Sequence, residues 1–173
     1  MKQLPNLLTL LRLALVPVIV IAYLANDGTS WLIFGLFFIA GLSDYVDGKL
    51  ARSTGTISEF GKLWDPIADK LVIGAALVLL TVDQIIPVFI TAIILTREIV
   101  ITIARFATLS YGVLAADRGG KLKTMLQGFS LLFLLAPADL KFFALPMLYL
   151  ATVLTVITGV RYLTQLAKLR SNK

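Results

Sequence analysis

The chain alternates between long apolar stretches and short polar breaks. A helix that crosses a bilayer needs about 20 mostly apolar residues. Six stretches approach or reach that length, and they predict helices over residues 7–25, 31–45, 63–82, 85–109, 122–137 and 142–163. Turn-forming residues occupy the breaks at 26–30, 83–84, 118–120 and 137–139. The pattern predicts an all-α integral membrane protein, with six transmembrane helices in a single domain over residues 1–173.

The second apolar stretch is the shortest as counted. Its helical pattern continues through residues 44–52, which contain several charged side chains. We therefore expect one longer helix whose end projects beyond the hydrocarbon.

Composition narrows the chemistry. Of 173 residues, 58% are hydrophobic, against about 45–50% in an average soluble domain. The net charge of +6 would suit a nucleic-acid partner in a soluble protein. In so apolar a chain it favours membrane anchoring and anionic lipid or phosphate ligands instead, with no nucleic acid. Because the chain has no cysteine and no histidine, a general base must be a carboxylate, a lysine, a tyrosine or a bound hydroxide.

The positive charges predict the orientation. The breaks near 26–30 and 83–84 carry no lysine or arginine, and the break near 138–141 carries only Lys141. Basic residues gather at the opposite ends of the predicted helices: Lys2, Lys49, Arg52, Lys62, Arg118, Lys121, Lys123, Lys168, Arg170 and Lys173. Cytoplasmic segments of membrane proteins are enriched in Lys and Arg. Both termini and the charged segment after residue 43 are therefore expected on the cytoplasmic side.

Four aspartates carry the most specific signal. Asp44 and Asp47 are spaced i,i+3, and Asp65 and Asp69 are spaced i,i+4, so each pair points from one face of its own helix. A carboxylate at membrane depth is costly and needs a partner. Four that converge would repel one another unless cations lay between them. The pattern predicts a polar cavity, open to the cytoplasm, that holds divalent metal on hard oxygen ligands.

Two metals on shared carboxylates suit displacement at phosphorus. Gly48 and Gly61 remove side chains beside the aspartates, which allows a substrate to approach the helices closely. Arg52 can bind a phosphate with its planar guanidinium.

Residues 44–69 resemble the full signature of the CDP-alcohol phosphatidyltransferases. That signature reads D, two residues, D-G, two residues, A-R, eight residues, G, three residues, D, three residues, D, and every fixed position and gap is present. The resemblance implies that Asp44, Asp47 and Asp65 ligate Mg²⁺ or Mn²⁺, as two ions. It also implies that Asp69 completes the metal site and acts as the base for the acceptor hydroxyl. The pocket for CDP would then be shaped by Gly48, Ala51, Arg52 and Gly61.

Two other interpretations of the aspartates stay open. They could be helix caps and solvated surface charges, or the ion pathway of a metal or proton transporter. A transporter would explain the acids but not Gly48, Gly61 and Arg52.

Residues 6–12, 96–99 and 120–124 resemble the bacterial phosphatidylglycerophosphate synthases of this family. The resemblance implies transfer of the phosphatidyl group from CDP-diacylglycerol to sn-glycerol 3-phosphate, by a homodimer in the prokaryotic cytoplasmic membrane. Binding of the acceptor phosphate requires positively charged side chains, which Arg105, Lys121 and Lys123 could supply. Membrane anchoring is the alternative role for either lysine. Two alternative acceptors stay open. One is inositol phosphate, and the other is phosphatidylglycerol, as in cardiolipin synthase.

Polar residues on two other predicted helices allow structural or functional roles. Asn6, Thr9 and Arg12 follow at i, i+3 and i+6, so they could form a stripe that faces the nucleotide. Equally, Asn6 could cap the helix and Arg12 could extend to the interface.

Arg97, Glu98 and Arg105 lie on the fourth predicted helix. Glu98 and Arg105 share a face and could pair. In that case Arg97 would be an arginine that extends to the interface, although a functional role for these residues is equally open.

Overall fold

The computed structural model describes the backbone over residues 4–54, 59–107 and 118–171, and the side chains of residues 7, 9–46, 64, 67–104 and 120–168. Within these ranges the chain forms six α-helices: α1 (Leu4–Ala25), α2 (Trp31–Thr54), α3 (Glu59–Val82), α4 (Val88–Ala107), α5 (Arg118–Leu134) and α6 (Lys141–Ser171).

Each predicted apolar stretch corresponds to one of these helices, and α2 continues to Thr54 as expected. The predicted turn at 118–120 is wrong, because α5 begins at Arg118 and includes Gly119 and Gly120. Most helical stability in proteins comes from packing rather than from residue propensity. α5 packs along α6, and packing of this kind can outweigh the low helix propensity of two glycines.

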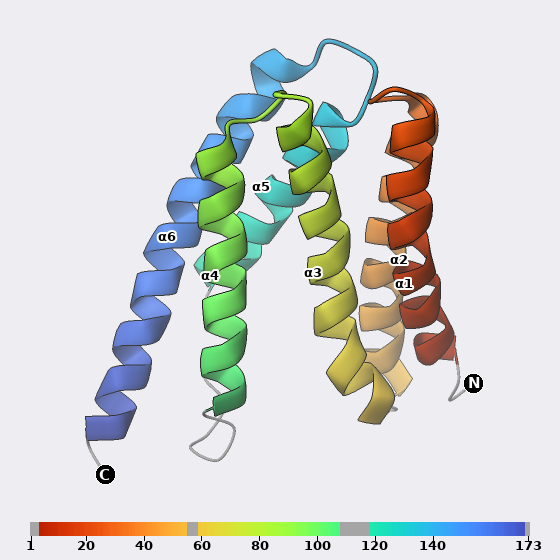
Figure 1. Cartoon of the computed structure of the whole chain (residues 1–173). Coiled ribbons are helices and arrows are strands. Elements are labelled where there is room, and N and C mark those ends of the chain that lie inside the picture. The colour runs from red at the N-terminus through yellow and green to blue at the C-terminus, as the bar shows by residue number, and fades with distance from the viewer. Residues whose placement is uncertain (1–3, 55–58, 108–117, 172–173) are drawn as a thin grey trace.

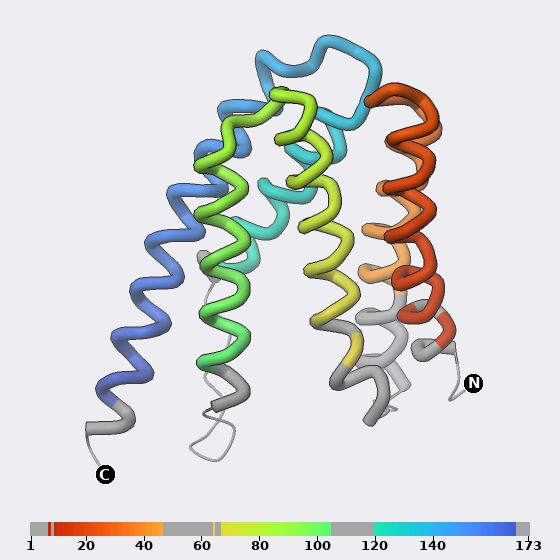
Figure 2. Tube along the Cα trace, in the orientation of Figure 1, coloured from red at the N-terminus to blue at the C-terminus, as the bar shows by residue number. Residues whose placement is uncertain are grey.

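The helices run alternately up and down the molecule (Figure 1). α1 packs on α2 and α3, while α6 packs on α4 and α5. α3 joins the two groups through contacts with α4 and α5. α5 crosses the bundle obliquely, and α1 begins at the same end of the molecule at which α6 ends (Figure 2). This common end is the one at which α3 also begins, so it is the end nearest the signature aspartates.

The core contains aliphatic side chains from every helix, among them Ile19, Ile33, Leu77, Ile90, Leu131 and Leu148. The outward surface is also apolar, and Phe142, Ile21 and Val88 are well exposed on it. Among the described side chains, residues Lys141–Lys168 form the one segment long and apolar enough to cross a membrane. Thr9–Ala25 and Trp31–Val46 are apolar but shorter. An apolar exterior around an apolar core suits a helix bundle in lipid.

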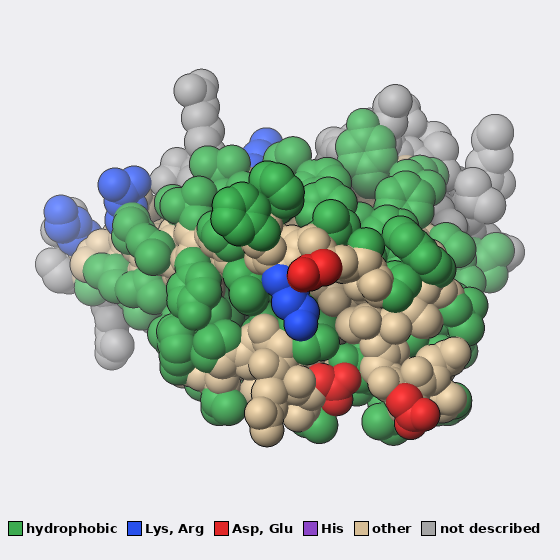
Figure 3. All heavy atoms as spheres, turned by 90° about the horizontal axis from the view of Figure 1, so that it is seen from above, with side chains coloured by type: hydrophobic (Ala, Val, Ile, Leu, Met, Phe, Trp, Pro, Cys, Tyr) green, Lys and Arg blue, Asp and Glu red, His purple; other side chains and the backbone are tan. Residues whose placement is uncertain are grey.

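The opposite end of the bundle is closed by turns. The Tyr23 hydroxyl donates a 2.5 Å hydrogen bond to Asp83 Oδ2, which ties the last turn of α1 to the α3–α4 turn. Gly28 has a φ of +119°, and a Cβ on it would lie 3.2 Å from the same Asp83 oxygen. Hydrophobic and uncharged polar atoms dominate this face, with few charged side chains (Figure 3). The sequence prediction that this end lies away from the cytoplasm rests on the same scarcity of cations and stays a prediction.

Candidate active site

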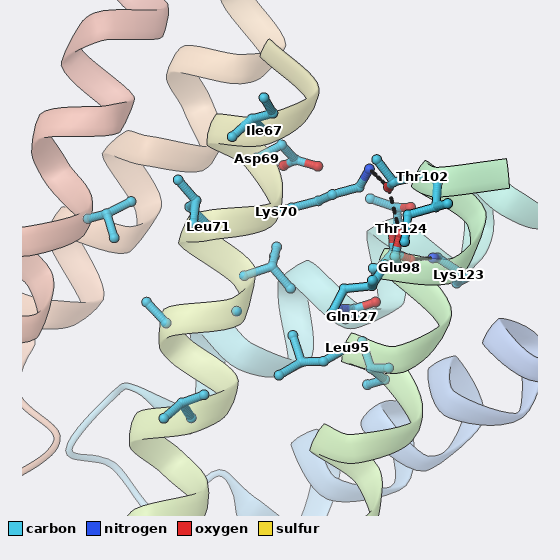
Figure 4. Close-up of a pocket in the computed structure, with 18 residues that line it drawn as sticks. Ile67, Asp69, Lys70, Leu71, Leu95, Glu98, Thr102, Lys123, Thr124 and Gln127 are labelled. Atoms are coloured by element: carbon cyan, nitrogen blue, oxygen red, sulfur yellow. Dashed lines mark hydrogen bonds and ion pairs between the residues drawn. The ribbon is translucent and has the colours of Figure 1, made fainter. Parts of the chain in front are cut away.

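A pocket of about 580 Å³ lies between α3, α4 and α5. One part of its wall is polar and is formed by Asp69, Lys70, Glu98, Thr102, Lys123, Thr124 and Gln127. The rest is apolar and includes Leu71, Ile73, Val78, Ile94, Leu95 and Ile99. In Figure 4, Asp69 and Lys70 project from α3 toward the polar side chains of α4. Charged groups and an apolar wall therefore meet in one cavity.

Glu98 is at the centre of the polar network. Its Oε1 accepts a hydrogen bond from the Lys123 ammonium group and another, 2.8 Å long, from the Arg97 guanidinium. Lys70 donates to Thr102 Oγ1, and that hydroxyl donates a 2.6 Å bond to the Glu98 carbonyl oxygen. The network thus joins α3, α4 and α5 and fixes the two pocket lysines on either side of α4.

Arg97 continues the network to α6. Its guanidinium lies 3.5 Å from Thr158 Oγ1, and its side chain packs over Gly159, where a Cβ would come within 3.1 Å of Arg97 Cγ. Of the two interpretations left open for Arg97, the one in which it extends to the interface is not supported, since its side chain turns inward to Glu98 and α6. The proposed partner of Glu98, Arg105, has a side chain outside the described residues.

The polar stripe of α1 contacts the first aspartate of the signature. Arg12 is 1% exposed and its Nη1 lies 2.8 Å from Asp44 Oδ1, while half of the Asp44 side chain remains exposed. Arg12 therefore does not extend to the interface. Thr9 is fully buried one turn earlier on α1. Within the described side chains, α1 therefore contacts the signature through the ion pair of Arg12 with Asp44.

Asp44 and Asp69 share one electrostatic environment, although they lie on different helices. The Asp69 carboxylate is repelled by those of Asp44 and Glu98, and is attracted by Arg12 and Lys70. Repulsion between carboxylates is the condition that a bound cation relieves.

The structure places some of the predicted site residues and not others. Asp69 and Lys123 line the pocket, whereas Lys121 is exposed and does not. The side chains of eight predicted residues lie outside the described part of the chain: Asn6, Asp47, Gly48, Ala51, Arg52, Gly61, Asp65 and Arg105. Among the described side chains there is no group of three or more that could hold a metal ion. The metal, CDP and acceptor roles therefore stay predictions.

Sequence reasoning missed Lys70, Thr102 and Gln127, which line the same pocket. A signal existed for two of them. Lys70 directly follows Asp69, and Gln127 lies four residues after Lys123, on the same helix face. Thr102 lies on α4 and accepts a hydrogen bond from Lys70 of α3. No spacing within a single helix predicts that contact.

Comparison with known proteins decides the family. Residues 2–158 match the family model described as CDP-alcohol phosphatidyltransferase. The chain belongs to this family. The resemblance inferred from the aspartate signature is thereby confirmed, and the match extends over most of the phosphatidyltransferase rather than over the signature alone.

Curated relatives of this phosphatidyltransferase match it over most of their own length. It is 41% identical over 172 residues to a Mycobacterium tuberculosis protein named probable phosphatidylglycerophosphate synthase, covering 94% of this chain and 81% of that one. It is 38% identical to a Haemophilus influenzae protein, covering 96% of this chain and 94% of that one. It is 35% identical to a Bacillus subtilis protein, covering 95% of both. The last two are named CDP-diacylglycerol–glycerol-3-phosphate 3-phosphatidyltransferase.

Proposed function

We propose that this phosphatidyltransferase transfers the phosphatidyl group from CDP-diacylglycerol to sn-glycerol 3-phosphate, with phosphatidylglycerol phosphate and CMP as products. The observation that carries the proposal is the pocket that brings Asp69 of the signature together with Lys70 and Lys123. A carboxylate that can accept a proton and cations that can bind a phosphate are what this reaction needs. The names of the relatives, which match along nearly the whole chain, support the same reaction.

The proposed reaction is a single displacement at phosphorus. The acceptor hydroxyl oxygen attacks the phosphorus that carries diacylglycerol, and the bond from that phosphorus to the CMP oxygen breaks. The hydroxyl proton passes to the Asp69 carboxylate, and CMP leaves with the bonding electron pair. Lys123 and Lys70 orient the acceptor by binding its phosphate.

The four aspartates, Asp44, Asp47, Asp65 and Asp69, would hold two Mg²⁺ or Mn²⁺ ions. All four supply carboxylate oxygens, the ligands that these hard cations prefer. The half-exposed Asp44 carboxylate and the position of Asp69 in the pocket wall fit such a site. When bound, the ions would neutralise the diphosphate and stabilise the leaving oxygen. Arg12 holds one oxygen of Asp44 and so orients it.

The substrate pockets are proposed around this centre. The CDP pocket would be formed by Asn6, Thr9, Gly48, Ala51, Arg52 and Gly61. The acceptor phosphate would be bound by Lys123 and Lys70 of the pocket, together with Arg105 and Lys121 as the sequence predicts. The burial of Thr9 and of the neighbouring Arg12 on the α1 face near Asp44 supports a polar wall there. The burial of Lys123 in the pocket supports a role in binding rather than in membrane anchoring.

The proposed membrane arrangement has all six helices crossing the bacterial cytoplasmic membrane. The cavity and both termini would face the cytoplasm, and the enzyme would be a homodimer. The shared end at which α1 begins and α6 ends supports an even number of crossings (Figure 1). The apolar part of the pocket wall, with Leu71 and Ile99, supports entry of the acyl chains from the inner leaflet.

One assay tests the reaction and the choice of acceptor. Purified protein in detergent is given labelled CDP-diacylglycerol with glycerol 3-phosphate, inositol phosphate, serine or phosphatidylglycerol. Release of CMP with glycerol 3-phosphate alone supports the proposal, whereas release with another acceptor replaces that part of it. Without CMP in any arm, metal-dependent uptake by liposomes would instead favour the transporter interpretation of the same carboxylates.

A further inference from the structure

The side chain of Gln127 is polar, buried and not used by the proposed reaction. It is 4% exposed and it lines the pocket. Within the part of the chain that the structure describes, no hydrogen bond joins its amide to another residue, and its amide atoms are not enclosed by protein. The amide is therefore open to the space of the pocket, where a ligand can bond to it.

The position of Gln127 indicates which part of a ligand it would meet. It follows Lys123 by one turn on the same face of α5, about 6 Å further along the helix axis at about 1.5 Å per residue. In Figure 4 it lines the pocket beside the group formed by Glu98 and Lys123. Ile94 and Leu95 supply apolar wall to the same cavity. The amide is therefore a neutral polar group between the phosphate-binding cation and the apolar wall.

We propose that Gln127 binds the C2 hydroxyl of glycerol 3-phosphate and is a specificity-determining residue; this inference rests on the proposed function. The acceptor has a phosphate, a reacting hydroxyl and a second hydroxyl that takes no part in the chemistry. The phosphate matches Lys123 and the reacting hydroxyl matches Asp69. The second hydroxyl both donates and accepts hydrogen bonds, as a glutamine amide does.

The consequence is discrimination between two acceptors that differ by one atom. 3-Hydroxypropyl phosphate keeps the phosphate and the reacting hydroxyl but lacks the C2 hydroxyl. A site built to bond a hydroxyl rejects the analogue without it, because the site's own polar group is left unpaired. We expect wild-type kcat/KM to favour glycerol 3-phosphate by at least about 10-fold, the effect of one lost hydrogen bond.

Two variants of similar size, Gln127→Leu and Gln127→Met, test the assignment. Each should lose activity with glycerol 3-phosphate but not with 3-hydroxypropyl phosphate, so that the preference falls to about 1. The KM for CDP-diacylglycerol should not change. Gln165→Leu is the matched control, since it makes the same change at an exposed position of α6, and it should keep the wild-type preference.

Each outcome of this experiment either supports or overturns the inference. The inference is overturned if the wild type shows a preference near 1. It is also overturned if a Gln127 variant keeps the wild-type preference or loses activity equally with both acceptors. So would a rise in the KM for CDP-diacylglycerol with the acceptor preference intact, because Gln127 would then contact the lipid. Turnover of 3-hydroxypropyl phosphate shows that a variant is folded. If Gln127→Leu does not fold, Gln127→Met decides whether the inference holds. Wild-type protein that releases no CMP with glycerol 3-phosphate would overturn the proposed function itself, whereas turnover with an unchanged preference overturns this inference alone.

Discussion

Lys123→Gln is the substitution that most directly tests the proposed acceptor site. Lys123 is buried in the pocket wall and its ammonium group is paired with Glu98. If it also binds the acceptor phosphate, its loss removes a charge-assisted hydrogen bond worth about 1.5–3 kcal/mol. At about 1.4 kcal/mol per decade, the apparent KM for glycerol 3-phosphate should rise roughly 10- to 150-fold.

The same substitution also perturbs the fold, and the structure allows the two effects to be separated. Breaking a buried ion pair from one side costs about 3–5 kcal/mol. Here the cost should lie at the low end, because Arg97 still holds Glu98 Oε1 at 2.8 Å. For a chain of this length the thermal midpoint should fall by roughly 6–12 °C. The double variant Lys123→Gln with Glu98→Gln removes the carboxylate that lost one of its two cations and leaves an amide oxygen for Arg97. It should therefore recover part of the stability without recovering the acceptor KM.

The assay is CMP release by purified protein in detergent. Glycerol 3-phosphate is varied at saturating CDP-diacylglycerol, and then the reverse, so that the two KM values are measured separately. Lys168→Gln is the control for loss of one positive charge, since Lys168 is exposed on α6. Lys121→Gln should raise the acceptor KM less than Lys123→Gln does, because Lys121 is exposed and lies outside the pocket lining.

Two results would refute the reasoning. One is a folded Lys123→Gln variant with the wild-type KM for glycerol 3-phosphate. The other is a double variant that recovers the acceptor KM together with stability, because Lys123 would then act only through Glu98.

The remaining predictions concern the metals, the base and the far end of the bundle. Asp47→Asn, Asp65→Asn or treatment of the wild type with EDTA should nearly abolish CMP release through loss of Lewis-acid stabilisation; full turnover without metal would refute the metal site. Asp69→Asn should abolish turnover but keep most CDP-diacylglycerol binding, measured by equilibrium binding of the labelled lipid. A parallel loss of turnover and lipid binding would argue against a role of Asp69 mainly as the base. Tyr23→Phe removes the hydrogen bond to Asp83 and should lower the thermal midpoint by about 2–4 °C, for about 1 kcal/mol, with kcat unchanged; an unaltered midpoint would show that this bond contributes nothing net.

Local pattern predicted the helices well, and the errors have physical causes. Apolar stretches broken by turn residues located all six helices, and the charged continuation of the second was also predicted correctly. The predicted start of α5 was wrong, because Gly119 and Gly120 are turn-forming by propensity but lie in the first turn of a helix that packs on α6. Propensity acts within a few residues, whereas the contact that overrides it joins α5 to a helix later in the chain.

The sequence by itself determined the family and the candidate chemistry. Residues three or four apart share a helix face whatever the tertiary structure is, so the spacing of Asp44, Asp47, Asp65 and Asp69 is informative without coordinates. The chemistry of carboxylates at membrane depth then points to bound cations.

Only the tertiary structure decided which faces meet. It brought Lys123 of α5 to Glu98 of α4, turned Arg97 inward, and placed Gln127 in the same pocket as Asp69. Helical periodicity specifies the residues on a face but not the rotation, the tilt or the neighbour of a helix. Those depend on how whole helices pack against one another, and no spacing within a single helix contains that information.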